Sequence, residues 1–134
     1  MRGRHALPAL LAPFALALAA PAHADPAYDQ CVRKALIKED FQDCGKAWLA
    51  RRDAELNRVW GMAYGGTDVT VKPLLLDEQR AWIVFKDKSC LMWRDGELSR
   101  YAETVQFYLC RVAVIDARIK QLETIASDPL IGHE

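Results

Sequence analysis

The sequence predicts a small all-α protein, in which three long helices form an antiparallel bundle or hairpin, preceded by one short helix and held by two disulfides. The first indication is that apolar residues recur at intervals of three and four along three long segments, which is the spacing of one helix face. The second is an even number of cysteines, four, in a chain that begins with the features of an export signal. No segment shows the sustained alternation of apolar and polar residues that is typical of a strand.

Residues 1–24 have the three parts of a cleaved signal peptide. Arg2 and Arg4 supply positive charge at the start, residues 6–20 are apolar and uncharged, and residues 22–24, Ala-His-Ala, carry the small-x-small pattern for cleavage. We therefore expect the mature protein to begin after this segment and to be periplasmic or secreted.

A membrane anchor and a buried helix are the alternatives for this first segment. Its apolar stretch is about 15 residues long, short of the roughly 20 that a membrane helix needs, and Pro8 and Pro13 interrupt it. A lipid anchor would require a cysteine directly at the cleavage point, whereas Asp25 stands there and the first cysteine is Cys31. We expect residues 25–134 to form one domain with no membrane span and no lipid anchor.

The first two helices are expected over Pro26 to Ile37 and Asp43 to Tyr64. Asp25 is a suitable N-cap, and proline suits the first helical position because its missing N–H would be unpaired there. The acidic and polar stretch from Glu39 to Asp43 is expected to break the chain between them. Apolar residues recur along one face of the second helix at Leu49, Leu56, Val59, Trp60 and Ala63.

The third and fourth helices are expected over Val71 to Trp93 and Ser99 to Ala126, with a turn at Arg94-Asp95-Gly96 between them. Short connections of this kind make sequential helices antiparallel. One face of the third helix is expected to contain Leu75, Trp82, Phe85 and Ser89. The fourth has the most regular pattern, a continuous core-facing seam of Tyr101, Val105, Tyr108, Val112, Ile115, Ile119, Leu122 and Ala126.

The four cysteines are predicted to form two disulfides, because their number is even and the expected compartment is oxidising. They are Cys31, Cys44, Cys90 and Cys110. A zinc site with four thiolate ligands is the alternative, but structural zinc sites usually contain a C-x(2–4)-C pair, and the chain has none. Of the three possible pairings we favour Cys31–Cys44 and Cys90–Cys110, since each joins neighbouring helices; the sequence leaves the pairing open.

Neither catalysis nor a cofactor or metal is expected. Two of the three histidines lie in the predicted signal peptide and the third, His133, is next to last, so a Ser-His-Asp or Cys-His arrangement would lack a positioned base. Asp53 and Asp87 could be proposed as a carboxylate pair, but a narrow helical bundle offers little cleft. The 18 basic and 18 acidic residues are interspersed, and so no nucleic-acid partner is expected.

Several polar residues lie close to the apolar helix faces: Asp53, Asn57, Gln79, Arg80, Asp87 and Arg118. One interpretation is a polar binding pocket. We favour the other, a network of ion pairs and hydrogen bonds between helices, because buried charges are normally paired. Trp48 and Trp93 lie off the strongest apolar stripes, and we interpret them as shields of the disulfides rather than anchors for a partner.

These residues form a recognisable pattern. After Cys31 and Cys44 the chain reads Asp53-x-x-Leu56-Asn57-x-x-Trp60, then Gln79-Arg80-Ala81-Trp82-Ile83-x-Phe85-Lys86-Asp87-x-x-Cys90, and then Cys110, Arg118 and Leu122. The pattern resembles the LprI-like lysozyme-inhibitor domain family over about Tyr28 to Ile125, and its second segment is the most specific part. Trp60 and Lys86 depart mildly from the family, whose members often have Tyr and Arg there.

The resemblance implies an exported, helical, disulfide-bonded domain in a family named after an inhibitor of lysozyme. We interpret its matching polar residues as structural, so it locates no inhibitory site. The first functional hypothesis is inhibition of a lysozyme-type muramidase, with the turns from Gly65 to Thr70 and from Arg94 to Arg100 as candidate probes of the sugar cleft. The second is a cell-envelope interaction or structural module that binds another protein, a peptidoglycan fragment or itself. The oligomeric state is open.

Overall fold

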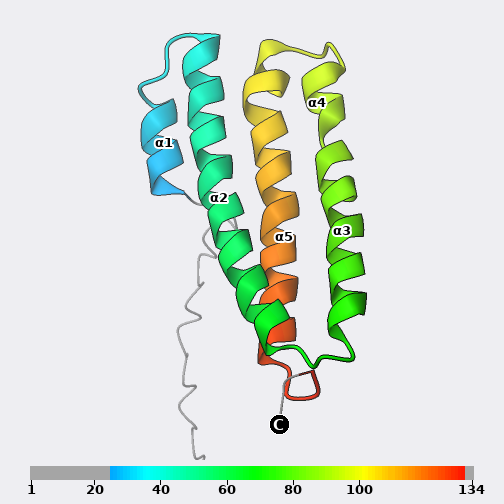
Figure 1. The fold of residues 1–134 in the computed structure, drawn as a ribbon. Coiled ribbons are helices and arrows are strands. Elements are labelled where there is room, and N and C mark those ends of the chain that lie inside the picture. The colour runs from blue at the N-terminus through cyan, green and yellow to red at the C-terminus, as the bar shows by residue number, and fades with distance from the viewer. Residues whose placement is uncertain (1–24, 132–134) are drawn as a thin grey trace, which may run out of the picture.

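A computed structural model describes residues 25–131, which form helices and turns and no strand. The signal-peptide prediction for residues 1–24 lies outside this range. Figure 1 shows the helices side by side in an up-and-down arrangement. In chain order they are α1 (Pro26–Val32), α2 (Lys38–Gly66), α3 (Lys72–Lys88), α4 (Leu91–Asp95), the π-helix η1 (Ala102–Gln106) and α5 (Phe107–Ser127). The predicted all-α fold with two disulfides is thus confirmed.

The boundary between the first two helices differs from the prediction. α1 starts as expected, with the Asp25 carboxylate accepting the Tyr28 N–H at 2.8 Å, but it ends at Val32 instead of Ile37. The next helix starts five residues before the predicted Asp43. The stretch 39–43 therefore does not separate two helices. Its carboxylates lie in the first turns of α2, where the helix dipole favours negative charge.

The core lies mainly between α2 and α5, which run parallel to each other (Figure 1). Its largest cluster combines Leu56, Val59 and Ala63 with Ile115, Ile119 and Leu122. A second cluster joins α1 to this pair and consists of Tyr28, Cys44, Trp48 and Val112. The predicted seam of the last helix is therefore buried from Tyr108 to Leu122, whereas its end members Tyr101 and Ala126 are exposed.

The third helix is attached through a narrow face. Leu75 and Gln79 are buried and Trp82 is half-buried, but Phe85, predicted on the same face, is 59% exposed. At 100° per residue Phe85 lies about 80° around the helix from Leu75, which places it at the edge of the contact. α3 ends at Lys88 instead of Trp93, since Cys90 adopts a left-handed backbone conformation (φ 69°) and the short α4 follows.

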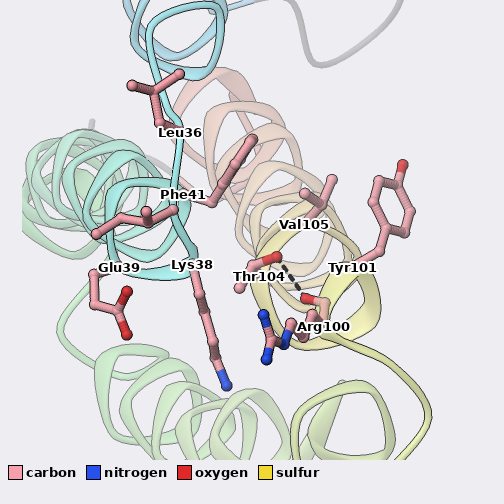
Figure 2. A pocket seen from close by; sticks show the side chains of 9 residues that line it. Leu36, Lys38, Glu39, Phe41, Arg100, Tyr101, Thr104 and Val105 are labelled. Carbon is pink, nitrogen blue, oxygen red and sulfur yellow. Dashed lines mark hydrogen bonds between the residues drawn. The ribbon is translucent and has the colours of Figure 1, made fainter.

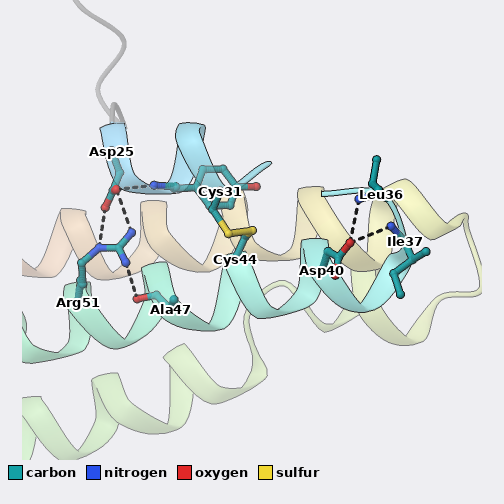
Figure 3. Close-up of a disulfide and its surroundings, with 9 residues drawn as sticks. Asp25, Cys31, Leu36, Ile37, Asp40, Cys44, Ala47 and Arg51 are labelled. Carbon is teal, nitrogen blue, oxygen red and sulfur yellow. Dashed lines mark hydrogen bonds and ion pairs between the residues drawn. A yellow bond between two sulfur atoms is a disulfide. The ribbon is translucent and has the colours of Figure 1, made fainter. Parts of the chain in front are cut away.

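The two disulfides have the favoured pairing. Cys31–Cys44, drawn in Figure 3, joins α1 to α2, and Cys90–Cys110 joins the α3–α4 junction to α5, with Cα–Cα separations of 5.7 and 5.8 Å. Each includes a cysteine from an early turn of a long helix, α2 or α5. Because these two helices begin at the same end of the molecule, both cross-links stabilise that end.

Two glycines of α2 provide a matched test of this packing. A Cβ added at Gly45 would lie 2.3 Å from the Tyr108 ring, whereas one added at Gly61 would have nothing within 4 Å. We expect Gly45→Ala to lower the free energy of unfolding by about 1–3 kcal/mol through overpacking. Gly61→Ala should raise it by about 0.5–1 kcal/mol, because alanine favours the helix. Urea denaturation of the oxidised proteins measures both, and equal effects would contradict the α2–α5 packing.

Candidate partner-binding end of the bundle

Two surface turns meet at the end of the molecule where α2 and the last helix begin. One is the loop 33–37 between α1 and α2, and the other is the turn 96–99 that follows α4; Figure 1 shows both at its top. The turn from Gly65 to Thr70 lies at the opposite end, because the 29 residues of α2 separate it by about 43 Å. The two turns proposed as probes therefore cannot enter one cleft together.

An open cavity of about 670 Å³ lies between these turns, and we call it the end pocket. Figure 2 shows the two walls, one from the start of α2 and the other from the segment that leads into α5. Its lining residues are Leu36, Ile37, Lys38, Glu39, Phe41, Arg100, Tyr101, Thr104 and Val105. The pocket thus combines exposed aliphatic and aromatic side chains with charged ones, a composition suited to a polypeptide partner.

The π-helix forms one wall of the end pocket. In η1 the Phe107 N–H donates to the Ala102 carbonyl, a five-residue step where an α-helix has four. This wider turn changes the register of the preceding residues relative to the seam, and Tyr101 is 58% exposed instead of buried. The Thr104 hydroxyl donates to the Arg100 carbonyl at 2.6 Å, and Lys38 of α2 forms an ion pair with Glu103 of η1. π-helical turns of this kind are frequent at functional sites.

A single carboxylate organises the other wall. Asp40 accepts the backbone N–H groups of Leu36 and Ile37 at 2.9 and 3.2 Å, as Figure 3 shows. Ile37 is the N-cap of α2, and its side chain has no hydrogen-bond acceptor. Asp40, three residues into the helix, instead reaches back and accepts the backbone N–H groups that precede α2. The same two hydrogen bonds hold the pKa of Asp40 below its ordinary value. They also present Leu36 to solvent, at 89% exposure.

The predicted polar residues lie mainly between the helices and away from the end pocket. Arg118 is buried on α5, where its Nε donates to the Gln79 side chain at 2.9 Å and its Nη1 donates to both Glu78 and Gln121. Its guanidinium also lies 5.9 Å from the centre of the Trp82 ring. The structure thereby brings Gln79, Trp82 and Arg118 together at the α3–α5 contact.

A second polar contact involves a residue that sequence reasoning missed. Arg111 is buried on α5 and donates to the backbone carbonyls of Asp87 and Ser89 at 3.2 and 2.9 Å. Burial lowers the pKa of Arg111. Asp53 and Asp87 lie beside it, in a cavity of about 300 Å³. Nothing in the periodicity distinguished Arg111 from the exposed arginines, since its role depends on carbonyls freed where α3 ends.

The remaining motif residues and tryptophans have other surroundings. Leu56 is in the core, whereas Asn57 and Arg80 are exposed, with Arg80 paired to Asp77 on its own helix. Trp48 is only 1% exposed and stacks on Tyr28 beside the first disulfide. Trp93 is half-buried and packs in the cluster that contains Cys90 and Phe107. Both tryptophans therefore pack next to a disulfide.

No group of three or more His, Cys, Asp or Glu in residues 25–131 is placed to hold a metal ion. None of the helices over the same residues has both the length and the apolar character of a membrane span. Exposed apolar side chains do line the end pocket, among them Leu36, Ile37 and Tyr101.

Comparison with known proteins gives one informative result. The family model described as Lysozyme inhibitor LprI matches the chain over residues 31–122. The matched segment contains all four cysteines and every residue that lines the end pocket. The comparison with curated proteins found no match, and neither did the comparison with solved structures.

The role of Asp40 in the end pocket predicts a pH dependence. Because its pKa is lowered on folding, the order that it gives the loop is present above the ordinary pKa of aspartate, about 3.9, and is lost as the pH falls through the lower folded value. In ¹⁵N NMR spectra recorded from pH 6 to pH 2, the Leu36 and Ile37 amide shifts should titrate with a midpoint below 3.9.

The Asp40→Asn variant should abolish this titration and speed amide exchange at both residues. Asp43→Asn is the control, because Asp43 is exposed on the same helix and pairs only with Lys46 among the contacts described. Amide shifts that stay constant through the acid range in the native protein would show that Asp40 does not order the loop.

Proposed function

We propose that this chain, which belongs to the LprI lysozyme inhibitor family, binds and inhibits a lysozyme-type muramidase outside the cytoplasm. The family match over residues 31–122 is the observation that carries the proposal. Two disulfides support the compartment, since such bonds persist where the surroundings are oxidising. The proposed role is inhibitory and not catalytic.

The end pocket and the turn 96–99 are the surface that we propose for the muramidase. Lysozyme cleaves its substrate in a cleft between two carboxyl groups, so an inhibitor needs a projecting element with complementary chemistry. The turn is exposed along its length, and it is followed by Arg100 and Tyr101, the residue types that dominate interface hot spots. The cationic side chain of Arg100 complements a carboxylate, and Tyr101 and Leu36 offer apolar surface for burial.

Rigidity of this end supports the same assignment. A binding element that is already ordered loses less conformational entropy when it associates. Cys90–Cys110 fixes the start of α4 on α5, and Cys31–Cys44 fixes the loop 33–37 on α2. Glu97 takes a left-handed backbone conformation (φ 52°) at the tip of the turn, which gives the turn a defined shape. Both walls of the end pocket are thus covalently restrained.

A lysis assay tests the proposed activity. The oxidised mature protein, beginning at Asp25, is titrated against lysozyme acting on bacterial cell walls, with chicken-type and goose-type enzymes tested separately. We expect the lysis rate to fall with protein concentration and to recover after reduction of the disulfides. Lysis that is unchanged by a molar excess of folded protein, with every muramidase tested, would refute the inhibitory function.

Variants of the end pocket test the proposed surface separately. Tyr101→Ala and Arg100→Ala should each weaken inhibition by roughly 10- to 30-fold, the effect of removing an interface hot spot. The matched controls are Val69→Ala and Arg58→Ala, which remove exposed side chains away from the end pocket and should leave inhibition unchanged. If the native protein inhibits and all four variants inhibit equally, another surface contacts the enzyme.

A further inference from the structure

The third helix carries an exposed stripe on the side away from the bundle. Its core-facing residues are Leu75, Gln79, Trp82 and Lys86. On the far side, at intervals of three and four, lies the outer stripe, which consists of Leu74, Asp77, Ala81, Val84 and Lys88 with Phe85 alongside. All six residues are exposed. A stripe with this spacing is the one that a helix presents to a partner helix.

Much of the outer stripe is apolar. Leu74 is 70% exposed, Val84 56% and Phe85 59%, although side chains of this size are usually buried in a small protein. The stripe continues into a groove of about 400 Å³ between α3 and α5, lined mainly by apolar atoms of Trp82, Phe85, Ala113, Val114 and Ala117. A contiguous apolar surface of this kind marks an interaction site.

The charges on the outer stripe determine which partner fits. Asp77 lies near its start and Lys88 near its end, with Ala81 and Val84 symmetrically between them. When two such helices run antiparallel, residue i of one lies opposite residue 165 − i of the other. Asp77 then faces the partner's Lys88, and Ala81 faces the partner's Val84. In a parallel pair, like charges would face each other at both ends, which is unfavourable.

We propose that the outer stripe of α3 is a homodimer surface, on which two copies of this chain pair antiparallel about a two-fold axis between Ala81 and Val84. The surface is self-complementary, as such an interface requires. Ala81 at its centre lets the backbones approach closely, and Phe85 and Leu74 supply the apolar area. Lys88 forms none of the ion pairs described for the folded chain, and Asp77 has only an exposed pairing with Arg80 at 3.2 Å.

The dimer would leave the end pocket accessible. α3 runs along the long axis of the molecule, and the end pocket lies beyond its C-terminal end. An antiparallel pair therefore places its two pockets at opposite ends, where each is free to bind. The dimer is independent of lysozyme binding, so either proposal can fail without the other.

Sedimentation velocity on the oxidised mature protein between about 1 µM and 1 mM tests the interface. We expect a reversible dimer that is abolished by Phe85→Glu and retained in Val69→Glu, which puts a charge on another exposed apolar residue, in the α2–α3 turn. A native protein that stays monomeric at the highest concentration overturns the proposal. A dimer that persists in Phe85→Glu overturns it as well.

Charge reversal tests the antiparallel register. Asp77→Lys alone places lysines opposite lysines at both symmetric contacts, and Lys88→Asp alone places aspartates opposite aspartates. Each should weaken the dimer by about tenfold, whereas the double variant D77K/K88D should restore native affinity. Melting temperatures of the monomers at low concentration separate this effect from changes in folding. A double variant no tighter than the single ones would exclude the antiparallel pairing.

Discussion

The α2–α5 seam is the contact on which the rest of the molecule depends. Ile115 and Leu122 on α5 are almost inaccessible, and they pack against Leu56, Val59 and Ala63 of α2. The other elements are attached to this pair and bury far less apolar surface of their own. Because burial of apolar area is the dominant favourable contribution to folding, the α2–α5 pair supplies most of the stability.

The peripheral elements are held by specific links at few points. α1 depends on its disulfide and on the stacking of Tyr28 on Trp48, at 4.3 Å between ring centres. α3 is tied to α5 by the polar groups of Gln79, Arg111 and Arg118 and by the second disulfide. A buried guanidinium is costly unless it is paired, so these arginines restrict α3 to the position in which they find acceptors. Polar contacts thus determine where the third helix lies.

As a consequence, two parts of the molecular surface are left uncovered. At one end, the loop 33–37 and the π-helix flank the end pocket, which is lined by both apolar and charged side chains. Along the outer side of α3, the narrow attachment leaves apolar residues uncovered. The chain belongs to the LprI lysozyme inhibitor family, and the end pocket is the surface proposed above for that role. The outer stripe has a different chemistry and suits self-association.

The sequence by itself determined the helical class and the apolar seam from Tyr108 to Leu122, because periodicity is a local signal. It favoured the observed disulfide pairing without deciding it. It also indicated the family through the motif from Gln79 to Cys90. Only the tertiary structure decided that Tyr101 leaves the seam, that Asp40 orders the loop before α2 and that Arg111 is buried. These three features arise from contacts between segments. They are a π-helical turn, a carboxylate that caps a neighbouring loop, and backbone carbonyls left without partners at the end of a helix. The spacing of apolar residues along one helix does not report such contacts, and so it could not predict the end pocket.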